Sequence, residues 1–191
     1  MATADPPRRG RPRSEEVRRA VLAATFDLAA EDDPRRLSMD AIAWHAGVSK
    51  ETLYRWWRSK TEVVLEALAE HGDETIPLPD TGSLRGDLRA FLRATVVAAD
   101  PVTQRLLRTL AAEASADPGI AHLVRDRFIA RRRAALREIL VRAVDRGELG
   151  RSDVAITTDL IYGSLWYRVV FDVAPLDDRW ADAVARRIAP P

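Results

Sequence analysis

Apolar residues recur along most of the chain at the three- and four-residue spacings of amphipathic helices. In the first such segment Val17, Val21, Ala24 and Leu28 share one face of a helix that we expect Ser14 to cap. Sustained alternation of apolar and polar residues is absent from the sequence, as are the Asn-Gly and Asp-Gly pairs typical of tight hairpins. The pattern therefore predicts an all-α protein.

Short helices are predicted to follow, each preceded by a serine that can cap a helix N-terminus. One starts after Ser38 and stops at Gly47, and the next starts after Ser49. Ser59 and Glu62 form a capping-box pattern that opens a further helix. Two short helices joined by a tight turn that contains glycine are typical of a helix-turn-helix.

Longer helices are predicted in the rest of the chain. The helix after Ser59 is expected to end near 71–72, and residues 73–82, with two prolines and a glycine, are expected to be a linker. About nine helices are expected in all, forming a three-helix N-terminal head and a helical C-terminal domain. The later helices are expected at 83–99, 102–116, 117–146, 152–171 and 177–188.

Composition and charge narrow the function. The 191 residues are 47% hydrophobic and 31% charged, and no cysteine is present, which excludes disulfides and cysteine-ligated metals. The net charge is +1, but residues 1–60 carry +3 and the remainder −2, with four arginines near the start. We expect a flexible basic arm at 1–13, although a solvated tag is an alternative. The Arg131-Arg132-Arg133 run is interpreted as a solvated helix face.

Several classes of protein are not indicated. The most apolar run, 160–174, is short and contains charged residues, so no membrane span is expected. No apolar region follows the basic N-terminus, and we expect a cytoplasmic protein without membrane contact. The motifs G-x-S-x-G, H-E-x-x-H, G-x-G-x-x-G and the P-loop are absent, and the three histidines are far apart. We therefore expect no enzyme activity, no metal and no cofactor.

Residues 39–60 carry the strongest motif. They read MDAIAWHAGVSKETLYRWWRSK, which resembles the DNA-binding signature of the tetracycline-repressor (TetR) family: a short helix, a Gly-Val-Ser turn, a Thr-Leu-Tyr recognition helix and a Ser-Lys start of the next helix. The resemblance covers about 14–70 and implies a DNA-binding domain at 14–72. Leu53 and Trp57 share one face of the recognition helix, so we expect them to anchor it and leave a polar face for the major groove.

The resemblance implies a role for each residue of this polar face. Lys50, Thr52 and Glu51 match positions at which the family reads base edges, whereas Tyr54 and Trp56 match phosphate contacts. The arginines of the arm are expected to follow the backbone or enter the minor groove. The full set expected to contact double-stranded DNA is Arg8, Arg9, Arg11, Arg13, Ser38, Ser49, Lys50, Glu51, Thr52, Tyr54, Arg55, Trp56 and Lys60.

Glu51 departs from the family pattern, in which this position is usually small. A glutamate can accept a hydrogen bond from a cytosine amino group, or it can repel phosphate. The second reading leaves open an alternative function, a helical protein-interaction adaptor that has lost specific DNA binding.

The C-terminal part, expected as a domain at 83–191, also resembles the family. Tyr162, Gly163, Tyr167 and Arg168 match the last two helices of one regulatory-domain class, which form a four-helix dimer interface. A homodimer implies an inverted-repeat operator, and an ordinary monomer core is the alternative. The residues expected at the interface are Leu160, Leu165, Val169, Trp180, Val184 and Ile188.

The resemblance also implies a ligand pocket among the helices of 83–146 and the helix after Ser152. An unidentified small-molecule effector that prefers the state unable to bind DNA would lower operator affinity. A ligand-responsive repressor is therefore expected, and an activator remains open. The expected lining residues, each of which could instead belong to the core, are Phe91, Leu107, Leu110, Phe128, Tyr162 and Trp166.

Overall fold

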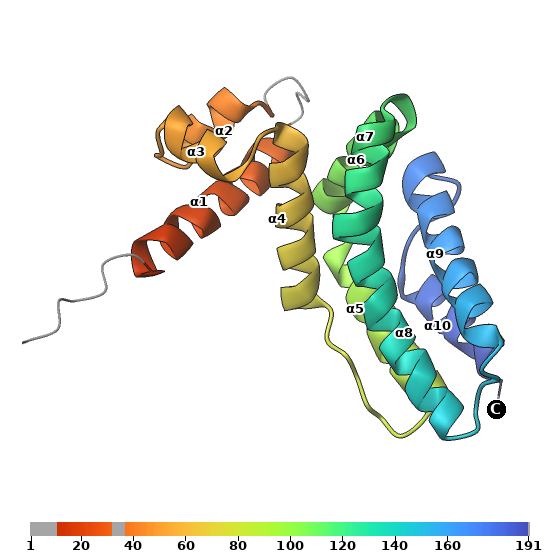
Figure 1. Ribbon diagram of the computed structural model, residues 1–191. Coiled ribbons are helices and arrows are strands. Elements are labelled where there is room, and N and C mark those ends of the chain that lie inside the picture. Colours follow the sequence, from red (N-terminus) through yellow and green to blue (C-terminus); the bar gives the residue numbers. More distant parts are fainter. Residues whose placement is uncertain (1–10, 32–36, 191) are drawn as a thin grey trace, which may run out of the picture. The chain divides into compact units, whose positions relative to one another are not determined.

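The computed structural model describes residues 11–31 and 37–190, with side chains described from residue 15 onward. All regular elements of these residues are helices, nine in number when the continuous run α7–η2–α8 is counted once (Figure 1). The predicted all-α fold is confirmed. The chain divides after Val64 into two compact units.

The first unit holds α1 (Arg11–Ala30), α2 (Met39–His45), α3 (Lys50–Trp56) and the first residues of α4 (Lys60–Thr75). Because α1 already begins at Arg11, Ser14 lies inside the helix, and the prediction that it caps the helix is wrong.

Serine caps define the two short helices as the sequence predicts. Ser38 Oγ accepts a hydrogen bond from the Ala41 N–H at 3.2 Å, and Ser49 Oγ accepts one from the Thr52 N–H at 3.1 Å. Between the helices Gly47 has a φ of 65°, which a residue without a side chain adopts at little cost. The predicted helix-turn-helix is therefore confirmed.

A small apolar core holds α3 in place. Leu53 and Trp57 are buried, as expected for the anchors of this helix, together with Val21 of α1 and Ile42 of α2. Burial of each such side chain contributes about 1.5–3 kcal/mol. The back of α3 is therefore fixed while its other side faces solvent.

Helix α4 continues to Thr75, beyond its expected end at 71–72. Gly72 lies inside the helix, where an added Cβ would come within 2.8 Å of Arg132 Nη1. This glycine admits the guanidinium group of Arg132 beside the helix, and it does not end the helix.

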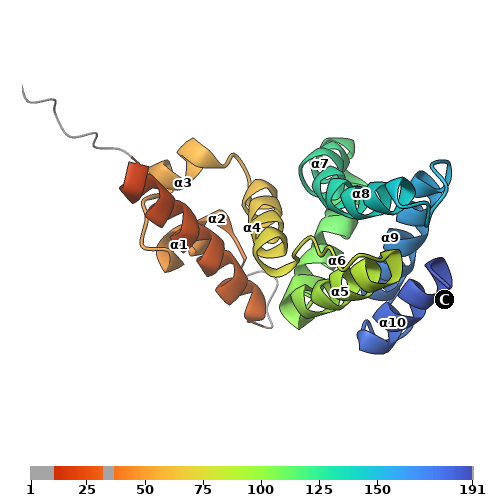
Figure 2. The same cartoon turned by 90° about the horizontal axis from the view of Figure 1, so that it is seen from below.

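The second unit is a bundle in which α10 and α8 pack against α5, and α9 packs against α6 and α8 (Figures 1 and 2). The predicted helix at 117–146 is one continuous run with a π-helical turn inside it, a feature that recurs at functional sites. The elements are α5 (Leu84–Ala98), α6 (Pro101–Ala116), α7 (Pro118–Val124), η2 (Arg125–Ile129), α8 (Ala130–Asp145), α9 (Asp153–Phe171) and α10 (Asp178–Ile188).

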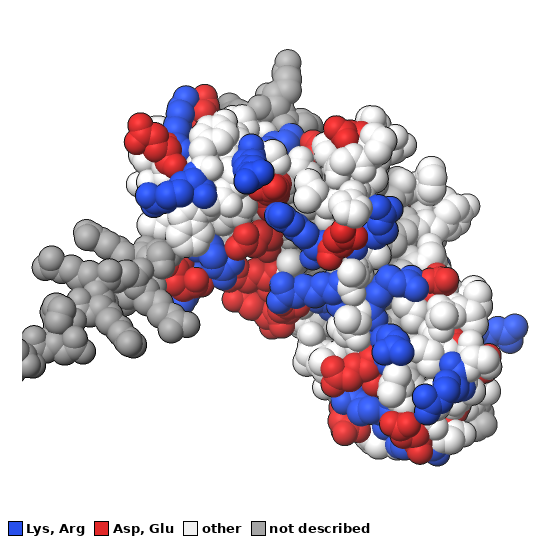
Figure 3. All heavy atoms as spheres, in the orientation of Figure 1, with Lys and Arg blue, Asp and Glu red and all other residues white. Residues whose placement is uncertain are grey.

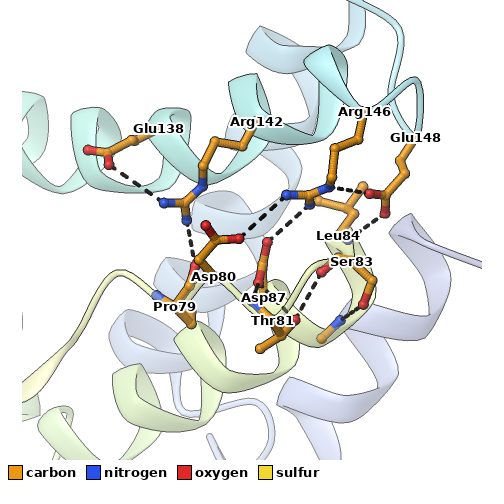
Figure 4. A network of polar contacts seen from close by, with 11 residues as sticks. Pro79, Asp80, Thr81, Ser83, Leu84, Asp87, Glu138, Arg142, Arg146 and Glu148 are labelled. Carbon is orange, nitrogen blue, oxygen red and sulfur yellow. Dashed lines mark hydrogen bonds and ion pairs between the residues drawn. The ribbon is translucent and has the colours of Figure 1, made fainter.

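Buried Asp87 ties the start of α5 to the end of α8 (Figure 4). Its carboxylate accepts hydrogen bonds from the Thr81 N–H at 2.6 Å, the Thr81 hydroxyl at 2.9 Å and Arg146 Nη2 at 3.1 Å. Burial raises the pKa of Asp87, but these hydrogen bonds outweigh burial and hold the pKa below its ordinary value. The network fixes the segment before α5 with a charged carboxylate.

Candidate functional site

The exposed face of α3 brings together most of those predicted DNA-contacting residues whose side chains the structure describes. Lys50, Glu51, Tyr54 and Arg55 are exposed and Thr52 is half-buried. They lie on a helix of seven residues whose opposite side is buried. A short helix with an apolar back and a polar front fits the major groove of B-form DNA.

Two polar pairs organise the N-terminal end of this face. Lys50 Nζ lies 2.7 Å from Asp40 Oδ2, a carboxylate at the start of α2 that the sequence analysis did not single out. Ser49 Oγ donates a hydrogen bond to Thr52 Oγ1 at 2.9 Å. Both members of the Lys50–Asp40 pair are about two-thirds exposed, so the pair is weak and a phosphate or base can replace Asp40.

Aromatic side chains extend the same surface. Tyr54 and Trp56 are exposed, and the ring of Trp56 stacks on that of buried Trp57 with centroids 5.7 Å apart. Trp44 of α2 is 83% exposed and was not among the predicted residues, because its helical position alone does not distinguish core from surface. Indole and phenol groups each offer one hydrogen-bond donor to a phosphate.

The remaining predicted DNA-contacting residues lie outside the exposed face of α3. Ser38 is half-buried, and because its oxygen accepts the Ala41 N–H, its own hydroxyl hydrogen can be donated elsewhere. Lys60 is half-buried at the start of α4. Arg8 and Arg9 lie outside the described residues, as do the side chains of Arg11 and Arg13 in α1.

The visible face of the first unit carries both signs of charge. Lysine and arginine side chains alternate there with aspartate and glutamate and do not form one continuous basic surface (Figure 3). Any DNA contact on this face therefore depends on individual cations and not on a continuous basic patch.

A cavity of about 300 Å³ lies inside the second unit. Four of the six predicted lining residues, Leu107, Phe128, Tyr162 and Trp166, line it. The prediction for Phe91 and Leu110 is wrong with respect to this cavity, because both are fully buried core residues outside its lining.

The cavity wall also contains polar residues that were not among the predicted lining residues. His71, Thr103 and Arg132 line it, the last from the run interpreted as a solvated face. That interpretation is wrong for Arg132, which is 8% exposed, because Gly72 leaves room for its guanidinium group inside the unit. The His71 Nε2–H donates to the Ala98 carbonyl at 3.0 Å.

Apolar side chains on α9 form an exposed stripe. Ile156, Leu160, Tyr167 and Phe171 are each more than half exposed, and Gly163 lies between them with open space around it. Of the predicted interface residues, only Leu160 belongs to this stripe.

Three other predicted interface residues lie inside the protomer. The predictions for Leu165, Val169 and Trp180 are wrong, because these side chains are buried within the second unit. Val184 and Ile188 of α10 are half-buried. Helix α9 is apolar on several sides, so the sequence did not distinguish its inner face from its outer face.

Within the described ranges, no helix has the length and apolar character needed to cross a membrane. No group of histidine and carboxylate side chains suited to a metal ion occurs in that part of the chain either.

The chain is similar to known regulators over most of its length. A family model described as bacterial regulatory proteins, tetR family, matches residues 21–67, and one described as tetracyclin repressor-like, C-terminal domain, matches residues 78–188. An uncharacterized HTH-type transcriptional regulator of Bacillus subtilis, YdeS, is 32% identical over 176 residues, which are 91% of this chain and 88% of YdeS.

Two further proteins extend this similarity. The DNA-binding transcriptional repressor TetR of Mycobacteroides abscessus is 32% identical over 171 residues, covering 87% of this chain and 88% of that one. The crystal structure of the TetR family transcription regulator SCO0332 has a TM-score of 0.78 at 32% identity, covering 91% of this chain and 96% of the other.

Proposed function

Because the chain belongs to the TetR family of DNA-binding transcriptional regulators, we propose that it is a homodimeric repressor whose operator affinity falls when a small molecule binds the cavity of the second unit. The observation that carries the DNA-binding part is α3, whose Lys50 and Tyr54 are exposed while Leu53 and Trp57 anchor its back.

Recognition of the operator uses α3 in the major groove. Lys50 leaves Asp40 for a base edge or a phosphate, and the hydroxyl of Thr52 contacts a base edge. Tyr54 donates its hydroxyl hydrogen, and Trp56 its indole N–H, to phosphates. Glu51 accepts a hydrogen bond from a cytosine amino group, so it favours operator sequences that have cytosine at this position.

Dimerisation uses the exposed stripe of α9. Contiguous exposed apolar side chains mark interaction surfaces, and Gly163 in the middle of the stripe allows a second helix to approach closely. A two-fold axis beside α9 pairs this stripe with its copy. Two heads then read half-sites about 34 Å apart, so the operator is an inverted repeat.

The test of DNA recognition is fluorescence anisotropy with DNA from the region upstream of the protein's own gene, over a series of salt concentrations. The Lys50→Ala, Tyr54→Ala double variant is expected to bind about 100-fold more weakly, since each contact contributes about 1–3 kcal/mol. Arg187→Ala, which removes an exposed charge from α10, is the matched control and is expected to bind as the unmodified protein does.

Equal affinity for this DNA and for scrambled DNA, together with no enriched inverted repeat in a genome-wide selection, would refute sequence-specific repression. For the dimer, Leu160→Glu is expected to yield monomers in sedimentation velocity, whereas Val97→Glu, at an exposed position of α5, is expected to leave the dimer intact. Dimers in both variants would exclude the α9 interface.

A further inference from the structure

The cavity of the second unit joins a mainly apolar wall to a buried cationic group. Leu68, Leu107, Phe128 and Trp166 supply apolar surface. A volume of about 300 Å³ lies at the lower end of the range for small-molecule sites. The wall therefore suits a compact apolar ligand, and the polar groups of the wall determine which polar group that ligand carries.

Arg132 is the main polar group in this wall. Its Nη1 lies 3.5 Å from Asp73 Oδ1, a long contact, and its Nη2 is buried without a hydrogen-bond partner among the described residues. A buried donor without an acceptor costs free energy, more so when it is charged. An acceptor inside the cavity would remove that cost.

Thr103 of α6 supplies a second buried donor to the same cavity. Its Oγ1 is buried and has no hydrogen-bond partner among the described residues, although its backbone N–H is satisfied by Asp100 Oδ1 at 2.7 Å. Two donors from different helices thus line one apolar cavity.

Three successive arginines of α8 form ion pairs with two carboxylates in and beside the cavity wall. Asp73 pairs with both Arg131 and Arg132, and Asp159 pairs with Arg133 at 2.5 Å. Three guanidinium groups therefore share two carboxylates. Because Asp159 is neutralised by Arg133, it does not repel an anion strongly.

Tyr162 does not compete for an anion either. Its hydroxyl donates to the backbone carbonyl of Arg132 at 2.7 Å. Burial raises the pKa of Tyr162 to about 12, so the phenol stays neutral and adds no negative charge.

We propose that the effector is an apolar monoanion, a compact hydrophobic molecule with one carboxylate-like acidic group that accepts hydrogen bonds from Arg132 Nη2 and the Thr103 hydroxyl. This proposal rests on the proposed function, in which the cavity holds the effector. Because hydrogen bonds between charged groups are stronger than those between neutral groups, the acidic end of the effector is the larger source of selectivity.

The test compares acids with their neutral amides, which have nearly the same shape. Decanoate with decanamide, and 1-naphthylacetate with 1-naphthylacetamide, are titrated into the full-length protein by isothermal calorimetry in the absence of DNA. At least one acid is expected to bind about ten-fold or more tightly than its amide. Binding of neither acid, or equal binding of acid and amide, overturns the proposal.

Substitutions test whether Arg132 causes the tighter binding of the acid than of its amide. Arg132→Met is expected to bind acid and amide alike, with the amide affinity unchanged, because the apolar wall remains. Arg131→Met removes a neighbouring guanidinium group that pairs with Asp73 but does not line the cavity, and it is the matched control expected to keep the preference.

Gly72→Ala is a second variant that retains the charge, for use if Arg132→Met does not fold. Its new Cβ would lie 2.8 Å from Arg132 Nη1, which displaces the guanidinium group and is expected to reduce the preference for the acid. An undiminished preference in both Arg132→Met and Gly72→Ala overturns the proposal.

The DNA assay separates this proposal from the proposed function. Acid binding that depends on Arg132 but leaves operator affinity unchanged would support the site and refute its role as effector site. Release of the operator by amides and acids at equal concentrations would support effector control and refute the anionic class.

Discussion

The two compact units place their candidate functional residues in opposite environments. In the first, most of the described candidates lie within 49–56, on or directly before the short helix α3, and most of these are exposed. In the second, the residues that line the cavity come from α4, α5, α6, η2, α8 and α9, and several are buried. A surface used for recognition is thus built locally, whereas a cavity is built by packing of distant segments.

This difference decides how substitutions act. On α3 a polar side chain can be removed at little cost in stability, because water replaces its neighbours. In the second unit the cost depends on whether a side chain fills the core or borders empty volume. Substitutions on α3 should therefore change DNA affinity with little change in stability. Substitutions around the cavity should change both ligand affinity and stability.

The largest expected effect distinguishes the core from the cavity wall. Phe91→Ala should lower the free energy of unfolding by about 4 kcal/mol, because Phe91 is fully buried and its loss creates a cavity. Phe128→Ala should cost about 2 kcal/mol or less, because this half-buried side chain already borders the cavity. Urea denaturation followed by circular dichroism measures both, and equal losses would contradict the assignment of Phe91 to the core alone.

Local rules predicted much of the fold. The serine caps at Ser38 and Ser49, the turn at Gly47 and the buried positions of Leu53 and Trp57 all follow from spacing within a few residues. Each depends on a hydrogen bond or a helical face that is visible in the sequence.

Tertiary packing explains where local rules were wrong. Gly72 has the sequence character of a helix end, yet α4 continues because the glycine accommodates Arg132. Arg132 is one of three successive arginines, and only the packing of α8 against its neighbours shows which one is buried. For the same reason Leu165 and Val169 could not be separated from the exposed stripe of α9.

A second, smaller effect concerns pH and the carboxylate of Asp87 in Figure 4. Its pKa is lower in the folded protein than the ordinary value of 3.8, so it stabilises the fold above about pH 4 and loses this contribution as the pH falls further. Asp87→Asn should therefore cost about 2 kcal/mol at neutral pH, and the difference from the unmodified protein should shrink at about pH 3.

Urea midpoints at both pH values measure this effect. Asp178→Asn is the control. Asp178 is exposed, and its contact with Arg93 is long, at 4.0 Å, so little change in stability is expected at either pH. A difference between Asp87→Asn and the unmodified protein that is constant with pH would show that the carboxylate charge contributes nothing.

The smallest expected effect lies in the head, where Asp40 competes with DNA for Lys50. Asp40→Asn should raise operator affinity up to about five-fold, because an exposed ion pair contributes less than about 1 kcal/mol and the lysine no longer has to leave it. Anisotropy titrations at low and high salt measure this gain, which should be larger at low salt. Asp178→Asn alters the net charge equally but in α10, so an equal gain there would attribute the effect to overall charge. A gain specific to Asp40→Asn would instead mean that Asp40 competes with DNA for Lys50 of the recognition helix. This competition arises within the helix-turn-helix and does not depend on the packing of distant segments that forms the cavity.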